Sequence, residues 1–318
     1  MNRKSIVSAL VMMSLAPLAL AADFPDKPVR VMVNMPAGGP LDIMARALSE
    51  KVSQYLGQPF VIENRGGSGG NIGAAAVAQA APDGYTWLMS LDSTFAINPH
   101  LYRSMGFELD RVRPVAVLAR NGILLVTNAK QGITSLDALM QASEKGPINF
   151  GTPGNGTPAH LTVALLNQHV KLNYNHIPYR GNAPATMAVV SGEVGAAVSA
   201  TPGVLQHVKS GALNALAVMG KTRSDLLPDV PTMAELKHPE VDFEVKYVLA
   251  APAGMDAARQ QVIVDAFVRA MGEPDIQERL KTMDVQAVIQ TGNAVTETIQ
   301  QLSEQNRKLI EASGMQVD

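Results

Sequence analysis

Two short segments of the sequence combine glycine and proline with backbone hydrogen-bond donors directly before a predicted helix. They are Pro36-Ala37-Gly38-Gly39-Pro40-Leu41-Asp42 and Thr152-Pro153-Gly154-Asn155-Gly156-Thr157-Pro158. The N-terminus of a helix has unpaired N–H groups and a partial positive charge, so it binds an anion without Lys or Arg. Glycine also lets the backbone approach a ligand closely. The two loops therefore predict a site for an anion such as a carboxylate.

An ordinary structural role also explains each loop. A strand that leads into a helix needs a cap, and Thr157 is a good N-cap, while Asp42 favours the first turn of a helix. One loop alone is better explained in this way, whereas two matched loops leave capping and ligand binding equally supported. The donors in the binding interpretation are the N–H groups of Gly38, Gly39, Leu41, Asp42, Gly154, Asn155 and Gly156 and the hydroxyls of Thr152 and Thr157.

Both loops fit a regular alternation of short apolar runs with amphipathic segments, which is typical of βαβ units and mostly parallel sheets. Residues 29–47 and 147–165 share the order strand, glycine loop, proline and helix, and this weak repeat predicts two similar lobes. Apolar runs at 118–125 and 244–249 are candidate crossings between the lobes. The expected fold is α/β, with residues 22–121 plus 245–318 in a discontinuous first lobe and residues 122–244 in a second.

The N-terminus has the pattern of a secretory signal peptide. Arg3 and Lys4 precede an uncharged run from Ile6 to Leu20, and Ala19-Leu20-Ala21 supplies the small residues that a signal peptidase reads. The run is shorter than the roughly twenty apolar residues of a membrane-spanning helix, so an uncleaved anchor is the less favoured alternative. We expect cleavage after Ala21 and export of a soluble chain to the periplasm.

The composition excludes several other functions. The chain has no cysteine, which rules out disulfides, thiol chemistry and a lipid anchor. A formal net charge of −2 with no polybasic stretch argues against nucleic acids and membrane surfaces as partners. The six histidines lack the spacing of a metal site. We therefore expect no cofactor and no metal.

The run Gly66-Gly67-Ser68-Gly69-Gly70 raises two enzymatic alternatives. It matches the G-x-S-x-G nucleophile elbow of serine hydrolases, and it lies between a predicted strand and a predicted helix. It also resembles the start of a dinucleotide fingerprint, but Ile72 stands at the third glycine position. A run this rich in glycine matches both patterns easily by chance. No oxyanion motif and no evident Asp/His pair occur later in the sequence. We predict that the chain is not an enzyme, with an exported serine hydrolase as the alternative.

A set of further segments, taken in chain order, carries a resemblance to one family. The segments are Phe24-Pro25-Asp26-Lys27-Pro28-Val29-Arg30, Pro36-Ala37-Gly38-Gly39, Glu63-Asn64-Arg65, Gly69-Gly70-Asn71-Ile72-Gly73, Ala81-Pro82-Asp83-Gly84-Tyr85-Thr86, Ala96-Ile97-Asn98-Pro99, Gly154-Asn155-Gly156-Thr157-Pro158-Ala159-His160-Leu161, Pro178-Tyr179-Arg180-Gly181 and Leu227-Pro228-Asp229-Val230-Pro231-Thr232. This ordered set spans essentially the whole chain after residue 21. It is similar to the substrate-binding proteins of tripartite tricarboxylate transporters, the Bug family.

The resemblance implies a two-lobed periplasmic binding protein of the Venus-flytrap type, with its ligand cleft between the lobes. It implies that the loops from Ala37 to Asp42 and from Thr152 to Thr157 pinch one carboxylate of a small organic ligand. It also places a second group of residues on the other loops that face the cleft. These are Ser93, Thr94, Tyr179, Arg180, Gly181, Ser199, Ala200 and Thr201.

This chain departs from the family pattern in places that bear on the ligand. Pro40 stands where many relatives have an N–H donor, and the loops around Ser93 and Ser199 differ from the commoner versions. Asp42 either orders the helix N-terminus or caps it. Arg180, the only cation in the candidate loops, either pairs with a second ligand carboxylate or is solvated.

The function that the resemblance implies is capture of a small organic carboxylate for uptake by a membrane permease. The expected partners are therefore this ligand and the permease, and we expect a monomer. A binding protein that serves a sensor instead of a transporter is an alternative that the sequence does not separate from transport.

Overall fold

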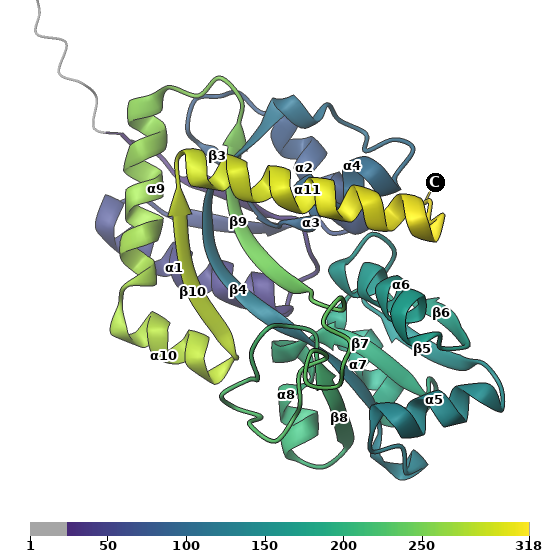
Figure 1. Ribbon diagram of the computed structural model, residues 1–318. Coiled ribbons are helices and arrows are strands. Elements are labelled where there is room, and N and C mark those ends of the chain that lie inside the picture. Colours follow the sequence, from purple (N-terminus) through teal and green to yellow (C-terminus); the bar gives the residue numbers. More distant parts are fainter. Residues whose placement is uncertain (1–23, 318) are drawn as a thin grey trace, which may run out of the picture.

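A computed structural model describes residues 24–317 of the chain (Figure 1). The expected signal peptide, residues 1–21, lies outside the described residues. The strands are β1 (Val29–Val33), β2 (Phe60–Asn64), β3 (Thr86–Leu91), β4 (Val112–Asn128), β5 (Ile148–Thr152), β6 (Tyr174–Pro178), β7 (Ala196–Ala200), β8 (Leu213–Val218), β9 (Glu244–Pro252) and β10 (Val285–Thr291). The α-helices are α1 (Pro40–Leu56), α2 (Asn71–Ala78), α3 (Ser93–Ala96), α4 (Asn98–Leu101), α5 (Leu136–Glu144), α6 (Pro158–Val170), α7 (Asn182–Ser191), α8 (Thr201–Lys209), α9 (Ala257–Met271), α10 (Pro274–Thr282) and α11 (Asn293–Ser313).

The strands form a mixed sheet that runs through both lobes in the order β2-β1-β3-β9-β4-β7-β5-β6, with β8 and β10 also paired to β4. Pairing is parallel within β2-β1-β3 in one lobe and within β6-β5-β7 in the other. The strands β4, β8, β9 and β10 pair antiparallel. Each parallel set follows the strand–loop–helix order that the sequence predicts, and the antiparallel strands connect the two sets.

Two long strands, β4 and β9, join the lobes. β4 pairs with β9 from Val112 to Gly122 and then pairs with β7 and β8 from Ile123 to Asn128. Both strands run from one lobe toward the other (Figure 1). The sequence signal at 118–125 covers only part of β4, because Arg113 and Pro114 interrupt the apolar pattern before it. Pro114 lies at a register shift, where a strand accommodates a residue that lacks an N–H.

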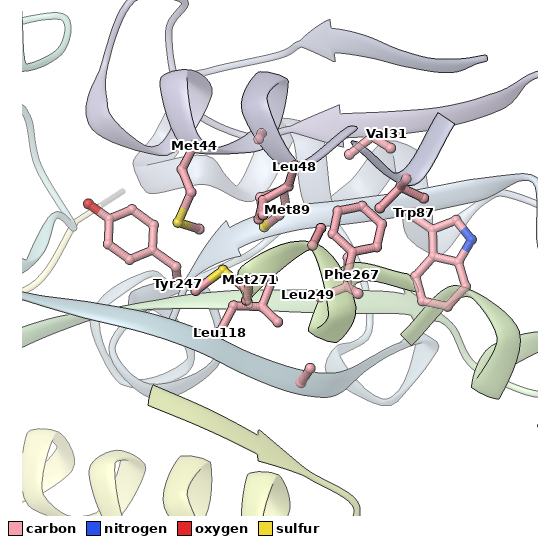
Figure 2. Packing of buried hydrophobic residues seen from close by; sticks show 14 of the residues in the cluster. Val31, Met44, Leu48, Trp87, Met89, Leu118, Tyr247, Leu249, Phe267 and Met271 are labelled. Carbon is pink, nitrogen blue, oxygen red and sulfur yellow. The ribbon is translucent and has the colours of Figure 1, made fainter. Parts of the chain in front are cut away.

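Proline and glycine mark the two ends of the helix α1. Pro40 occupies its first position, where a missing N–H costs nothing, and Gly57 ends it with a left-handed φ of 67°. The apolar face of α1 packs on β3 and on α9, which follows some two hundred residues later in the chain. Figure 2 shows this core, with Met44 and Leu48 of α1 beside Met89 and Phe267. The C-terminal helices therefore complete the core that the N-terminal strands begin.

The last helix, α11, contacts both lobes. It runs along one face of the first lobe and reaches α6 of the second (Figure 1). Its Val295 packs in the first-lobe core, whereas Ile310 shares an apolar cluster with Leu101, Tyr102 and the fully buried Leu161 of α6. Among residues 24–317, no helix combines the length and the apolar character needed to cross a membrane.

Two positions on α1 test how this helix packs on the core. Leu48 is fully buried in the core, whereas Ile43 is 37% exposed. Leu48→Ala should lower the free energy of unfolding by about 2–5 kcal/mol, because it removes buried surface and leaves a cavity. Ile43→Ala should change it by about 0.5 kcal/mol or less. Urea unfolding followed by circular dichroism measures both, and equal losses would contradict the packing described for α1.

Candidate ligand-binding site

A cavity of about 760 Å³ lies between the two lobes. The loop before α1 and the glycine run 66–70 form its first-lobe side. The loop before α6 and residues 179–184 form its second-lobe side. The sheet contributes Leu91, Val245 and Tyr247, which we name the strand wall. Leu91 and Tyr247 are register partners on β3 and β9, and Val245 points to the same face two residues away.

The carboxylate of Asp42 fixes the loop before α1. The backbone N–H of Gly38 donates to its Oδ2 at 2.8 Å, and Asn64 Nδ2 donates to its Oδ1 at 2.9 Å. Arg46, one turn further along α1, forms an ion pair with the same carboxylate at 3.0 Å. Burial alone would raise the pKa of Asp42, but these hydrogen bonds outweigh it and lower the pKa. Asp42 therefore stays ionised and orders the loop, as one of the two sequence interpretations expects.

This arrangement decides which N–H groups of the first loop stay free. The N–H of Gly38 donates to the Asp42 carboxylate, and the φ of +79° at this position suits glycine. No hydrogen bond within residues 24–317 uses the N–H of Gly39 or of Leu41. Both residues line the cavity, and Leu41 occupies the second position of α1.

The loop before α6 follows the same plan with different capping groups. Thr157 is the N-cap of α6, and its hydroxyl donates to the Gly154 carbonyl at 2.7 Å. The N–H of Gly154 bonds weakly to Thr152 Oγ1, and that of Gly156 bonds to His160 Nδ1, both at 3.4 Å. These contacts satisfy the two glycines that the sequence analysis counted as donors.

The free N–H groups in this loop belong to Asn155 and Ala159, since no hydrogen bond within residues 24–317 uses them. Ala159 is the second residue of α6 and lines the cavity, so it corresponds to Leu41 in α1. The weak sequence repeat thus becomes a matched pair of helix starts, each with proline at its first position. Residue type did not mark Ala159 as a donor, because it lies two residues beyond the glycine–threonine motif, after Pro158.

Two histidines stack beneath the second loop. The rings of His160 and His176 lie 4.1 Å apart at an angle of 13°, and His176 Nε2 lies 2.6 Å from Thr152 Oγ1. Burial lowers the pKa of His160 to about 3, with a further contribution from His176, and burial lowers the pKa of His176 to about 4. Both imidazoles are therefore neutral near pH 7 and support the loop by packing and hydrogen bonding.

The other loop residues that the sequence analysis named divide into two groups. Tyr179, Arg180 and Gly181 line the cavity, as does Ala37 in the first loop. Ser93, Thr94, Ser199 and Thr201 are buried and lie outside the cavity lining, because the protein uses three of them internally. The hydroxyl of Thr94 bonds to Asn34 and Ser90, that of Ser199 to Asn182, and that of Thr201 to the Gly122 carbonyl.

Several lining residues had no signal in the sequence analysis. The strand wall comes from positions that read as ordinary apolar strand, and Asn182 begins α7. The glycine run lines the cavity as well, with Ser68 at a positive φ of 47°. No hydrogen bond joins Ser68 to a histidine or a carboxylate in the described part of the chain. The described residues also include no group of three His, Cys, Asp or Glu side chains that could hold a metal.

The lobes approach each other closely around the cavity. The Tyr102 hydroxyl, in the first lobe, donates to the Asn155 carbonyl at 3.0 Å. A Cβ atom on Gly156 would lie 2.5 Å from that hydroxyl oxygen, and one on Gly181 would lie 3.1 Å from Pro36 Cγ. Glycine at these positions therefore allows the two sides to meet, and the cavity lies between loops that touch at these points.

Comparison with known proteins agrees with this architecture. The sequence profile of the tripartite tricarboxylate transporter family receptor (TctC) matches residues 44–315. The chain belongs to this receptor family. The protein BugT of Bordetella pertussis (strain Tohama I) is 36% identical over 273 residues, which cover 80% of this chain and 84% of BugT.

Two solved structures resemble this TctC-type receptor over nearly its whole length. The structure described as R. palustris Rpa4515 with adipate has a TM-score of 0.88 and 25% identity, and covers 92% of this chain and 99% of its own. MatC (Rpa3494) from Rhodopseudomonas palustris with bound malate has a TM-score of 0.84 and 27% identity, and covers 90% of this chain and 100% of its own. Family membership and these structures confirm the predicted family, the two-lobed binding-protein fold and the prediction that the chain is not an enzyme.

The histidine pair makes the stability of this receptor depend on pH. His160 and His176 are neutral in the folded protein and take up protons on unfolding once the pH falls below their ordinary pKa of 6.5. The unfolded state then binds more protons, so the free energy of unfolding should fall between pH 6.5 and about 4. His176→Gln should reduce this slope in urea unfolding measured at several pH values. His169→Gln, which lies outside the pair, serves as the control, and an unchanged slope in His176→Gln would contradict this assignment.

Proposed function

We propose that this receptor captures a small organic carboxylate in the periplasm and passes it to the membrane permease of a tripartite transporter. The observation that carries the proposal is the matched pair of helix starts at Leu41 and Ala159. Their free N–H groups enter one cavity from opposite lobes, and helix N-termini favour an anion there. The adipate and malate bound by two structural relatives support a carboxylate as this anion.

The residues at the site take different parts in this proposal. Gly39, Leu41, Asn155 and Ala159 donate N–H groups to the carboxylate. A second group shapes the two loops through internal hydrogen bonds or backbone geometry: Gly38, Asp42, Thr152, Gly154, Gly156 and Thr157. A third group forms the surrounding walls or supports them: Ala37, Ser93, Thr94, Tyr179, Arg180, Gly181, Ser199 and Thr201.

Arg180 has an electrostatic role in the proposal. It lines the cavity, it is exposed, and its guanidinium makes no hydrogen bond or ion pair with residues 24–317. An exposed cation at the edge of a cavity raises the local concentration of anions and speeds their entry.

Ligand capture proceeds by closure of the lobes about β4 and β9. We propose residues 22–121 plus 245–318 as the first lobe and residues 122–244 as the second, since β4 changes its pairing partners after Gly122. Hinge closure of this kind is a common motion of periplasmic binding proteins. The proposal also includes removal of residues 1–21 on export and a monomeric receptor.

Recognition of a carboxylate can be tested by thermal shift. A bound ligand stabilises the folded state by RT ln(1 + [L]/Kd), about 2.7 kcal/mol at a hundredfold excess over Kd. A screen of mono-, di- and tricarboxylates should give acids that raise the Tm by a few degrees, and sugars and polyamines should not. The methyl ester of the best monocarboxylate lacks the charge and should give no shift. An ester that stabilises as well as its acid would contradict the proposal.

Gly39 allows the donor itself to be tested with two substitutions. Its φ of −79° and ψ of 167° suit proline, and a Cβ atom there would meet only ordinary contacts, the nearest at 3.5 Å. Gly39→Pro removes the N–H and should weaken binding of the best acid by about 1.5–3 kcal/mol, the value of a hydrogen bond to a charged group. Gly39→Ala keeps the N–H and should bind nearly as well as the natural chain. Titration calorimetry measures both, and equal affinities would show that this N–H does not hold the ligand.

A further inference from the structure

The buried part of the cavity lining offers the ligand almost no free polar group. The strand wall is apolar apart from the Tyr247 hydroxyl, and that hydroxyl donates to Asn121 Oδ1 at 2.6 Å. Val245 and Tyr247 are 4% and 1% exposed. The side chains of Leu41 and Ala159, which flank the free N–H groups, are also buried. The carboxylate donors therefore adjoin apolar surface.

Other polar side chains of the lining are occupied by the protein. The amide of Asn64 donates to Asp42 and to the Met35 carbonyl, and its oxygen accepts from Arg46. The Thr157 hydroxyl bonds to Gly154. These groups are not available to hydroxyl groups of a ligand.

The polar groups that stay available lie where the solvent reaches them. Ser68, Asn155 and Arg180 are exposed, and Asn182 is half-buried. Arg180 is the only charged side chain among the described residues that line the cavity. Available polar groups therefore mark the accessible edge of the cavity, and apolar groups mark its interior.

We infer that the ligand is a carboxylate with a sizeable apolar body that carries no hydroxyl groups, such as a ring or an aliphatic chain. This inference rests on the proposed carboxylate capture. The body lies on the strand wall, where burial of apolar surface contributes affinity. A hydroxyl group there would lose its water without a protein partner, which costs free energy. A cavity of about 760 Å³ has room for such a body beside the carboxylate.

Two pairs of acids that share charge and carbon skeleton test the inference. They are cyclohexanecarboxylate with quinate, and hexanoate with gluconate. In titration calorimetry, the apolar acid of each pair should bind at least about tenfold more tightly. The polyhydroxy acid would bury several hydroxyl groups that have no protein partner, which weakens its binding. In the series butanoate, hexanoate and octanoate, each methylene should tighten binding about fourfold.

Two substitutions on β9 locate the apolar body. Val245→Thr places a hydroxyl in the strand wall and should weaken cyclohexanecarboxylate binding about fourfold. The affinity for quinate should rise relative to the affinity for cyclohexanecarboxylate. Val248→Thr is the control for loss of stability, because Val248 is equally buried but packs on the opposite face of the sheet. It should leave both affinities unchanged. Equal effects of the two substitutions would overturn the placement of the body on the strand wall.

The outcomes separate this inference from the proposed function. If quinate, gluconate or citrate binds as tightly as the apolar acids, the inference fails while carboxylate capture stands. If cyclohexanecarboxamide, which is neutral, binds as tightly as cyclohexanecarboxylate, carboxylate capture fails and takes the inference with it. Tight binding of the apolar acids alone supports both.

Discussion

The site depends on a few backbone N–H groups that have no protein partner at the cavity between the lobes. Every helix start leaves such groups, and a folded chain normally satisfies them with caps or water. Here side chains accept hydrogen bonds from neighbouring N–H groups of each loop: Asp42 accepts from Gly38, and His160 accepts from Gly156. The N–H groups of Leu41 and Ala159, two residues that line the cavity, are left without a protein partner. Proline at the first position of both helices adds to this effect, because it contributes no N–H that could compete for the same anion.

The two long strands make the matched helix starts face each other. Because β4 pairs with β9 in the first lobe and with β7 and β8 in the second, the lobes share a hydrogen-bonded connection instead of a flexible linker. The hydrogen bond from Tyr247 to Asn121 ties the two strands together at the strand wall. The same segment therefore positions the lobes, forms part of the ligand surface and must deform when the lobes move. Residue type alone does not reveal these roles of β4 and β9.

Local sequence signals predicted much of the fold and the loops of the site. Proline and glycine stand at the two ends of α1, and residues of the loops before α1 and α6 line the cavity. The strand wall could not be predicted, because apolar residues such as Val245 look the same whether they face a core or a ligand. The available donors were not assigned either. Gly38 and Gly156 each donate to a side chain four residues later, Asp42 and His160, and residue type alone does not specify these local hydrogen bonds.

The cluster that α11 shares with α6 affects how far the receptor opens. Ile310 of the last helix and Leu161 of the second lobe lie in one apolar group with Tyr102, at the side of the molecule where the lobes meet. A rotation large enough to part them would expose apolar surface to water and carry a free-energy penalty proportional to that area. The contact of α11 with α6 therefore opposes any rotation that would separate the two lobes at this side of the molecule.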